Sequence, residues 1–125
     1  MLDMISRYAD IIYMQTHILL DPNQVPLNVQ QRKAIRSINT HTQDLIEFLK
    51  THEETHPHLT EETMRHEIIN ILTPIVGYID MLADEWIGKL TAIQFNHVEL
   101  IYQCVQSLKQ YVLSHRFKVN ISISA

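Results

Sequence analysis

The sequence predicts an all-α protein, an antiparallel four-helix bundle made of two helical hairpins. Apolar residues recur at steps of three and four along most of the chain, as in amphipathic helices. Only two glycines and four prolines interrupt this pattern, and most of them fall between the periodic stretches. No alternating strand pattern occurs before the C-terminal tail, so four helices with short connections are the natural architecture.

The first hairpin is expected within residues 1–51. Its first helix covers about 2–20, and its predicted inward residues are Met4, Ile5, Tyr8, Ile11, Ile12, Ile18 and Leu19. The segment "DPNQVPL" (21–27) ends this helix with two prolines. The second helix then runs to about residue 51, and its predicted inward residues are Leu27, Ala34, Ile35, Ile38, Leu45, Phe48 and Leu49.

The second hairpin is expected at 60–114. Pro57 stops the preceding helix and Thr60 is the expected N-cap of the third helix, which runs to about Trp86. Gly88 marks the next turn. The fourth helix covers about 90–114, and its predicted inward residues are Leu90, Ile93, Ile101, Val105, Leu108 and Val112.

The whole chain, 1–125, is read as a single helical domain, and its two halves match each other. When the second half is laid on the first so that Ile68 falls on Ile5, apolar residues coincide repeatedly, as far as Leu108 on Leu45. We call this superposition the internal alignment. A duplicated hairpin explains the match. So does chance, because the offset is a whole number of heptads and any two heptad-patterned hairpins would coincide.

The tail at 117–125 alternates apolar and polar residues. This pattern predicts either an edge strand or a disordered end.

The composition excludes several classes of function. The formal charge is −4 and no dense basic cluster is present, which argues against nucleic-acid or anionic-membrane partners. No apolar run approaches the roughly 20 residues of a membrane span, and the N-terminus does not have the form of a secretory signal. The single cysteine, Cys104, excludes an internal disulfide and is expected in the core. These features predict a cytoplasmic protein.

The third helix has two contrasting faces. Its predicted buried stripe consists of Met64, Ile68, Ile71, Ile75, Ile79, Leu82 and Trp86. The opposite face carries small and polar residues, namely His66, Asn70, Thr73, Gly77 and Asp84. The helix therefore exposes its histidine instead of burying it.

The neighbours of His66 suit nucleophilic chemistry. A histidine side chain ordinarily titrates at about pH 6.5, so an exposed imidazole is a good nucleophile in the cell. Glu67 is adjacent in sequence, and a carboxylate there can take the proton of one ring nitrogen. Asn70, one turn along, can hold a phosphoryl oxygen or position a water. The small residues Thr73 and Gly77 would let another protein approach, and Asp80 could influence the choice of partner by repelling acidic surfaces.

The segment "HEIINILTPIVGY" (66–78) resembles the phosphoacceptor motif of the dimerisation and histidine-phosphotransfer domain of sensor histidine kinases. In that family an acidic residue follows the histidine directly, and Thr or Asn comes four residues after the histidine. A glycine comes eleven residues after the histidine, and an aromatic residue follows that glycine directly. The residues that match at this spacing are His66, Glu67, Asn70, Gly77 and Tyr78. The resemblance covers about 64–113. One position departs from it, because the proline usually found directly after the Thr/Asn position is here displaced to Pro74.

The resemblance implies that His66 is phosphorylated on a ring nitrogen, with Glu67 as general base and Asn70 binding phosphate or the water of dephosphorylation. The phosphoryl group would pass to an aspartate of a response-regulator receiver domain. Kinases of this family also need a glycine-rich ATP-binding domain, and none is recognisable in this sequence. We therefore expect no bound cofactor, with ATP used by a separate kinase.

Several interpretations of such a chain remain open. It is a stand-alone phosphotransfer protein, a fragment of a histidine kinase, or a degenerate relative that only binds a kinase or receiver. The family builds its bundle from two chains. This chain either supplies both hairpins as a self-contained monomer or forms a homodimer through its second hairpin. The equivalent of His66 in the first half is Asp3, so the first hairpin would carry no acceptor.

A competing motif lies at "HEETH" (52–56), which matches the zinc-protease pattern HExxH. Pro57 follows it directly and no third ligand has a recognisable spacing, so proteolysis is not favoured. His52, His56 and His58 remain weak candidate metal ligands, and the ordinary interpretation is a polar connection between the hairpins.

Overall fold

The fold consists of four α-helices packed side by side. The computed structural model describes residues 2–24, 26–55 and 61–114. The helices are α1 (Leu2–Leu20), α2 (Val29–Thr55), α3 (Glu61–Ala83) and α4 (Ala92–Ser114). Within these ranges there is no strand, so the predicted all-α class is confirmed. The tail at 117–125, predicted as a strand or disordered end, lies outside the described residues.

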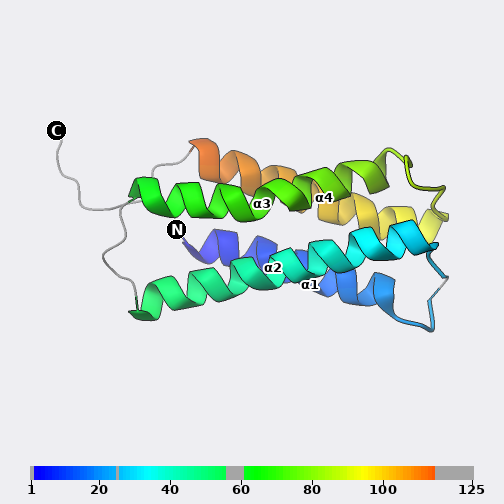
Figure 1. Cartoon of the computed structure of the whole chain (residues 1–125), viewed down its shortest axis with the longest axis horizontal. Coiled ribbons are helices and arrows are strands. Elements are labelled where there is room, and N and C mark those ends of the chain that lie inside the picture. The colour runs from blue at the N-terminus through cyan, green and yellow to red at the C-terminus, as the bar shows by residue number, and fades with distance from the viewer. Residues whose placement is uncertain (1, 25, 56–60, 115–125) are drawn as a thin grey trace.

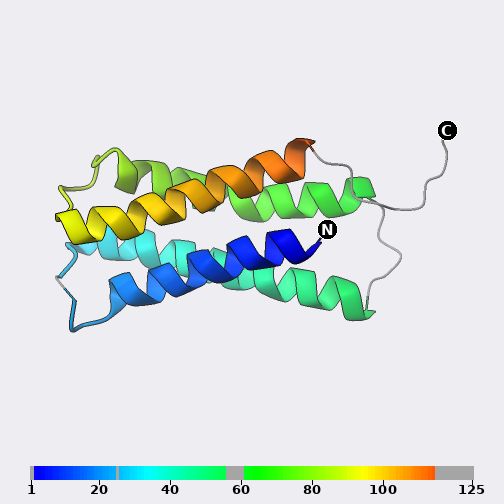
Figure 2. The same cartoon turned by 180° about the vertical axis from the view of Figure 1, so that it is seen from behind.

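The helices run alternately up and down. Each helix packs against two neighbours, in the pairs α1–α2, α2–α3, α3–α4 and α1–α4. α1 and α3 begin at the same end of the bundle, and the residues that follow α1 (21–24 and 26–28) and α3 (84–91) lie together at the other end (Figures 1 and 2). This is the predicted antiparallel four-helix bundle. None of the described helices has the length and apolar content needed to cross a membrane.

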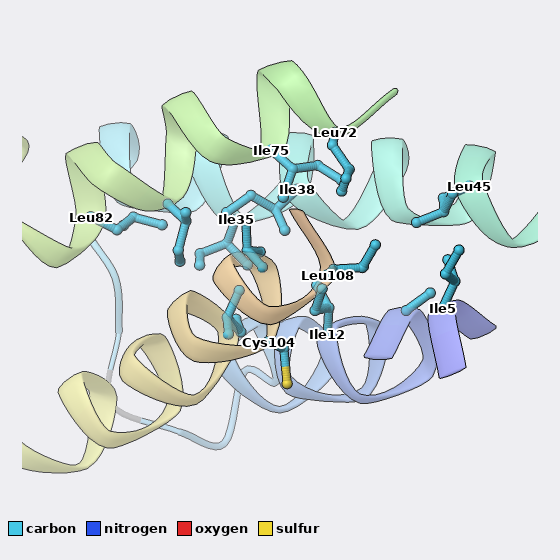
Figure 3. Close-up of a cluster of buried hydrophobic side chains, with 14 of the residues drawn as sticks. Ile5, Ile12, Ile35, Ile38, Leu45, Leu72, Ile75, Leu82, Cys104 and Leu108 are labelled. Atoms are coloured by element: carbon cyan, nitrogen blue, oxygen red, sulfur yellow. The ribbon is translucent and has the colours of Figure 1, made fainter. Parts of the chain in front are cut away.

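Each helix contributes one stripe of side chains to a common core (Figure 3). Buried positions follow one another mostly in steps of three and four residues, as expected for helices at a shallow crossing angle. The largest fully buried side chains are Ile5, Ile12, Ile35, Ile38, Leu45, Ile68, Leu72, Ile75, Ile79, Leu82, Ile101 and Leu108. Burying a side chain of this kind contributes about 1.5–3 kcal/mol, so this stripe is the main source of stability.

The buried stripe is narrower than predicted. The prediction that Met4, Ile11 and Ile93 face inward is wrong, because they are 42%, 38% and 57% exposed. Each of them directly precedes a buried residue, and one step along a helix is a rotation of about 100°. Leu72 and Val98 are buried although the predicted stripes omit them.

α3 ends earlier than predicted, at Ala83. The Glu85 amide donates to the Leu82 carbonyl at 3.1 Å, and the Trp86 amide donates to the Met81 carbonyl at 3.0 Å. These are the two hydrogen bonds of a Schellman motif, and Glu85 holds the left-handed position with φ 58°. The chain therefore turns away from the core, which leaves Trp86 77% exposed and makes its predicted burial wrong. At the other boundary, α2 continues to Thr55, beyond the predicted end at about residue 51.

α2 and α4 begin with the same structure, a capping box. The Gln31 amide N–H donates to Asn28 Oδ1 at 2.7 Å, and Gln31 Oε1 accepts from the Asn28 amide N–H at 2.9 Å. At α4, the Gln94 amide donates to Thr91 Oγ1 at 3.1 Å, and Gln94 Oε1 accepts from the Thr91 amide at 2.9 Å. The internal alignment places Thr91 on Asn28 and Gln94 on Gln31.

The same two glutamines connect the hairpins. Gln31 Nε2 donates to the Lys89 carbonyl at 3.1 Å, and Gln94 Nε2 donates to the Pro26 carbonyl at 3.3 Å. Lys89 falls on Pro26 in the internal alignment, so the two bonds are related by a pseudo-twofold exchange of the hairpins. A shared heptad pattern does not require matched caps or reciprocal bonds. These features favour a duplicated hairpin over chance.

Candidate functional site

The candidate site lies on the outer face of α3, near the helix start. His66, Glu67 and Asn70 are all exposed, as the helical geometry predicts. His66 and Asn70 are one turn apart and therefore share a face. Among the residues that the structure describes, the side chains of these three form no hydrogen bond or ion pair. The imidazole is thus accessible to a reactant from outside the chain.

Further along the same face the side chains are small. Thr73 is exposed, and its hydroxyl donates to the Ile69 carbonyl at 2.8 Å. Gly77 is exposed, and a Cβ added there would meet no atom within 4 Å. Packing within this chain therefore does not require glycine at position 77. Asp80 is half-buried one turn before the helix ends, so its carboxylate lies well away from His66 along the helix.

Pro74 lies inside α3, one turn beyond Asn70. A proline has no amide hydrogen, so the carbonyl of the residue four positions earlier receives no helical hydrogen bond. That residue is Asn70. The candidate site therefore has a backbone carbonyl without its usual helical donor, in addition to the Asn70 side-chain amide.

An apolar groove runs beside this face, between α3 and α4. Its hollow measures about 250 Å³. The lining residues are Ile69, Leu72, Thr73 and Val76 from α3 and Lys109 and Leu113 from α4. Leu113 is 58% exposed, and among the residues that the structure describes Lys109 is the one charged residue of the lining. The groove continues the surface that carries Thr73, so a partner that reaches His66 can also contact it.

Sequence reasoning missed this groove. The residues that form it lie at the edges of the buried stripes, and which edges meet depends on how α3 and α4 pair. The pairing is fixed in the structure by contacts such as that from Arg65 Nε to the Val112 carbonyl at 3.2 Å. The sequence signal is a set of apolar residues that directly follow core positions, namely Ile69, Val76 and Leu113.

The other candidate residues fall elsewhere. Cys104 is buried in the core as predicted, and burial raises the pKa of its thiol. His52 belongs to the end of α2, whereas His56 and His58 lie outside the described residues. No group of three or more potential metal ligands occurs among the described residues, and the cluster of these three histidines stays a prediction.

Comparison with known proteins gives no relatives: no protein family, curated protein or solved structure matches this chain.

Proposed function

We propose that this chain is a histidine phosphotransfer protein of a two-component pathway, acting in the cytoplasm. His66 accepts a phosphoryl group from a separate kinase and passes it to an aspartate of a response-regulator receiver domain. The observation that carries the proposal is the exposed His66–Asn70 face beside an apolar groove. The resemblance of 66–78 to a phosphoacceptor motif supports the same conclusion.

The reaction follows from the groups on this face. A ring nitrogen of His66 attacks the γ-phosphorus of ATP held by the kinase, so that a P–N bond forms and the P–O bond to ADP breaks. Glu67 takes the proton released from the ring. In the second step Glu67 returns the proton to the ring and the receiver carboxylate attacks the phosphorus. The P–N bond breaks, its electron pair stays on the ring nitrogen, and neutral imidazole is restored.

The remaining residues of the face position the reactants. The Asn70 amide donates to a phosphoryl oxygen, which restrains the group during transfer. Thr73 and Gly77 allow the receiver to approach closely, and its apolar surface enters the groove lined by Ile69 and Leu113. No cofactor is bound, because ATP belongs to the kinase. One chain supplies the whole bundle and one acceptor, since Asp3 stands at the position equivalent to His66.

The test is phosphorylation followed by transfer. The protein is incubated with a histidine kinase and ATP, and then with a receiver domain. We expect acid-labile phosphate on the wild type and its loss in His66→Gln. His17→Gln is the matched control, because His17 is also an exposed helical histidine, and it should be labelled like the wild type. Labelling that persists in His66→Gln would exclude His66 as the acceptor.

A second candidate function is a non-catalytic interaction module that binds a kinase or receiver. It is favoured by the lack of any hydrogen bond between His66 and Glu67 in the described structure, since neighbours in sequence on a helix do not face each other. This function predicts partner binding that is equal in the wild type and His66→Gln, with no phosphate on either.

A further inference from the structure

A second hollow, of about 440 Å³, lies at the loop end of the first hairpin. Its volume is in the range of sites for small ligands. Its lining includes apolar side chains, two cations and one carboxylate, among them Leu19, Leu20, Pro26, Arg32, Arg36 and Asp21. The hollow is far along the bundle from His66, because α3 begins at the opposite end (Figure 1).

The two arginines are one turn apart on α2, so their guanidinium groups can reach the same anion. Arg32 is half-buried, and its Nη2 donates to the Leu27 carbonyl at 3.1 Å, which holds it against the wall of the hollow. Arg36 is exposed and forms no hydrogen bond or ion pair within the described part of the chain. Asp21 also lines the hollow, but its carboxylate accepts the Asn23 amide at 2.9 Å and pairs with neither arginine there.

The second hairpin provides an internal comparison. In the internal alignment, Phe95 stands in place of Arg32 and Glu99 in place of Arg36. The connection there is stabilised from within, because Glu85 Oε2 accepts the Leu90 amide at 3.0 Å. Since the hairpins share their caps and core positions, the fold itself does not require a pair of arginines at this end. The cations therefore point to a ligand of the first hairpin alone.

We infer that this hollow binds a small organic anion with an apolar body, such as a medium-chain carboxylate. The carboxylate lies between Arg32 and Arg36, where planar guanidinium groups form charge-assisted hydrogen bonds. The hydrocarbon body covers the apolar wall formed by Leu20 and Pro26 and loses its contact with water. This inference is independent of the phosphotransfer proposal.

Titration calorimetry on the full chain with three probes tests the site. Octanoate is expected to bind saturably at one site per chain. Octanol lacks the charge and inorganic phosphate lacks the apolar body, so both should bind at least about tenfold more weakly. An octanol or phosphate affinity equal to that of octanoate would overturn the inference, as would octanoate binding that does not saturate.

The variant Arg36→Gln removes the cation that forms no hydrogen bond or ion pair within the described residues, so it should fold and melt like the wild type. Its octanoate affinity should fall about tenfold or more, because a charge-assisted hydrogen bond is lost. Arg7→Gln, which removes an exposed cation of α1, is the matched control and should bind octanoate like the wild type. Equal octanoate affinity in Arg36→Gln and Arg7→Gln would refute the site.

Discussion

Gln31 and Gln94 hold the two hairpins together by the same pair of contacts. Each caps its own helix and also donates from Nε2 to a backbone carbonyl of the opposite connection, Lys89 for Gln31 and Pro26 for Gln94. They are only 3% and 5% exposed. A buried amide with its groups paired on both sides of an interface fixes the register of the two hairpins at this end.

Replacing either glutamine by leucine should destabilise the bundle by about 1–3 kcal/mol, because two part-buried hydrogen bonds of the side chain are lost, one in the helix cap and one across the hairpins. The two losses should be similar, since the contacts are equivalent. Urea unfolding of Gln31→Leu and Gln94→Leu measures this. Gln30→Leu, which changes an exposed neighbour on α2, should alter stability by less than about 0.5 kcal/mol. A neutral Gln94→Leu would show that the reciprocal bonds do not matter.

The two glycines should respond oppositely to alanine. Gly77→Ala adds a methyl group in open space on a helix and should stabilise the protein by up to about 1 kcal/mol. Gly88 has φ 129°, and a Cβ there would collide with the side chain of Asn28, so Gly88→Ala should destabilise. Thermal unfolding of both variants checks the signs.

Under the proposed function, Gly77→Ala should also slow transfer to the receiver while leaving His66 phosphorylation by the kinase unchanged. The added methyl group lies on the face that the partner approaches. Transfer at the wild-type rate in a stabilised Gly77→Ala variant would mean that the receiver does not contact this part of α3.

Pro74→Ala should stabilise the protein, by at most about 3 kcal/mol, because a proline inside a helix removes one hydrogen bond and strains the turn before it. The new amide hydrogen would bond the Asn70 carbonyl. In the variant, the new amide of residue 74 should exchange its hydrogen more slowly than the amides at the exposed positions of α3. If stability does not rise, the helix has already relaxed around the proline.

Cys104 should make stability fall at alkaline pH. Burial raises the pKa of its thiol in the folded state, so the folded protein holds this proton where the unfolded chain releases it. The stabilisation is complete below the ordinary thiol pKa of about 8.5 and is lost as the pH rises above it. Urea unfolding between about pH 7 and pH 10 should therefore show a steeper decline for the wild type than for Cys104→Ala. Parallel declines would contradict this.

Helical periodicity was sufficient to predict the bundle. Core residues such as Ile5 in α1 and Ile75 in α3 each belong to a row of apolar residues that repeats every three or four positions along its helix. The same periodicity was also sufficient to place His66 and Asn70 on the outer face of α3. It failed where the chain leaves the helix, as at Trp86, because the left-handed turn at Glu85 has no glycine to signal it.

The sequence could not predict contacts that depend on how elements meet. Gln31 and the Lys89 carbonyl are 58 residues apart, and nothing in either segment indicates the other. The groove beside Thr73 likewise requires the pairing of α3 with α4. The arginines of the first hairpin were visible in the sequence, but only the fold brings Arg36 to the edge of an apolar hollow.

Both hairpins belong to one polypeptide, and this has a consequence for how their surfaces can change. In a symmetric homodimer every substitution appears twice, so an altered residue on one docking face is altered on the other as well. Here Asp3 and His66 stand at equivalent positions of the two hairpins. They can be different residues because each position is encoded separately. Covalent connection also makes the effective concentration of one hairpin for the other independent of dilution. The bundle can therefore carry different surfaces on its two hairpins, and its assembly does not depend on the concentration of the protein.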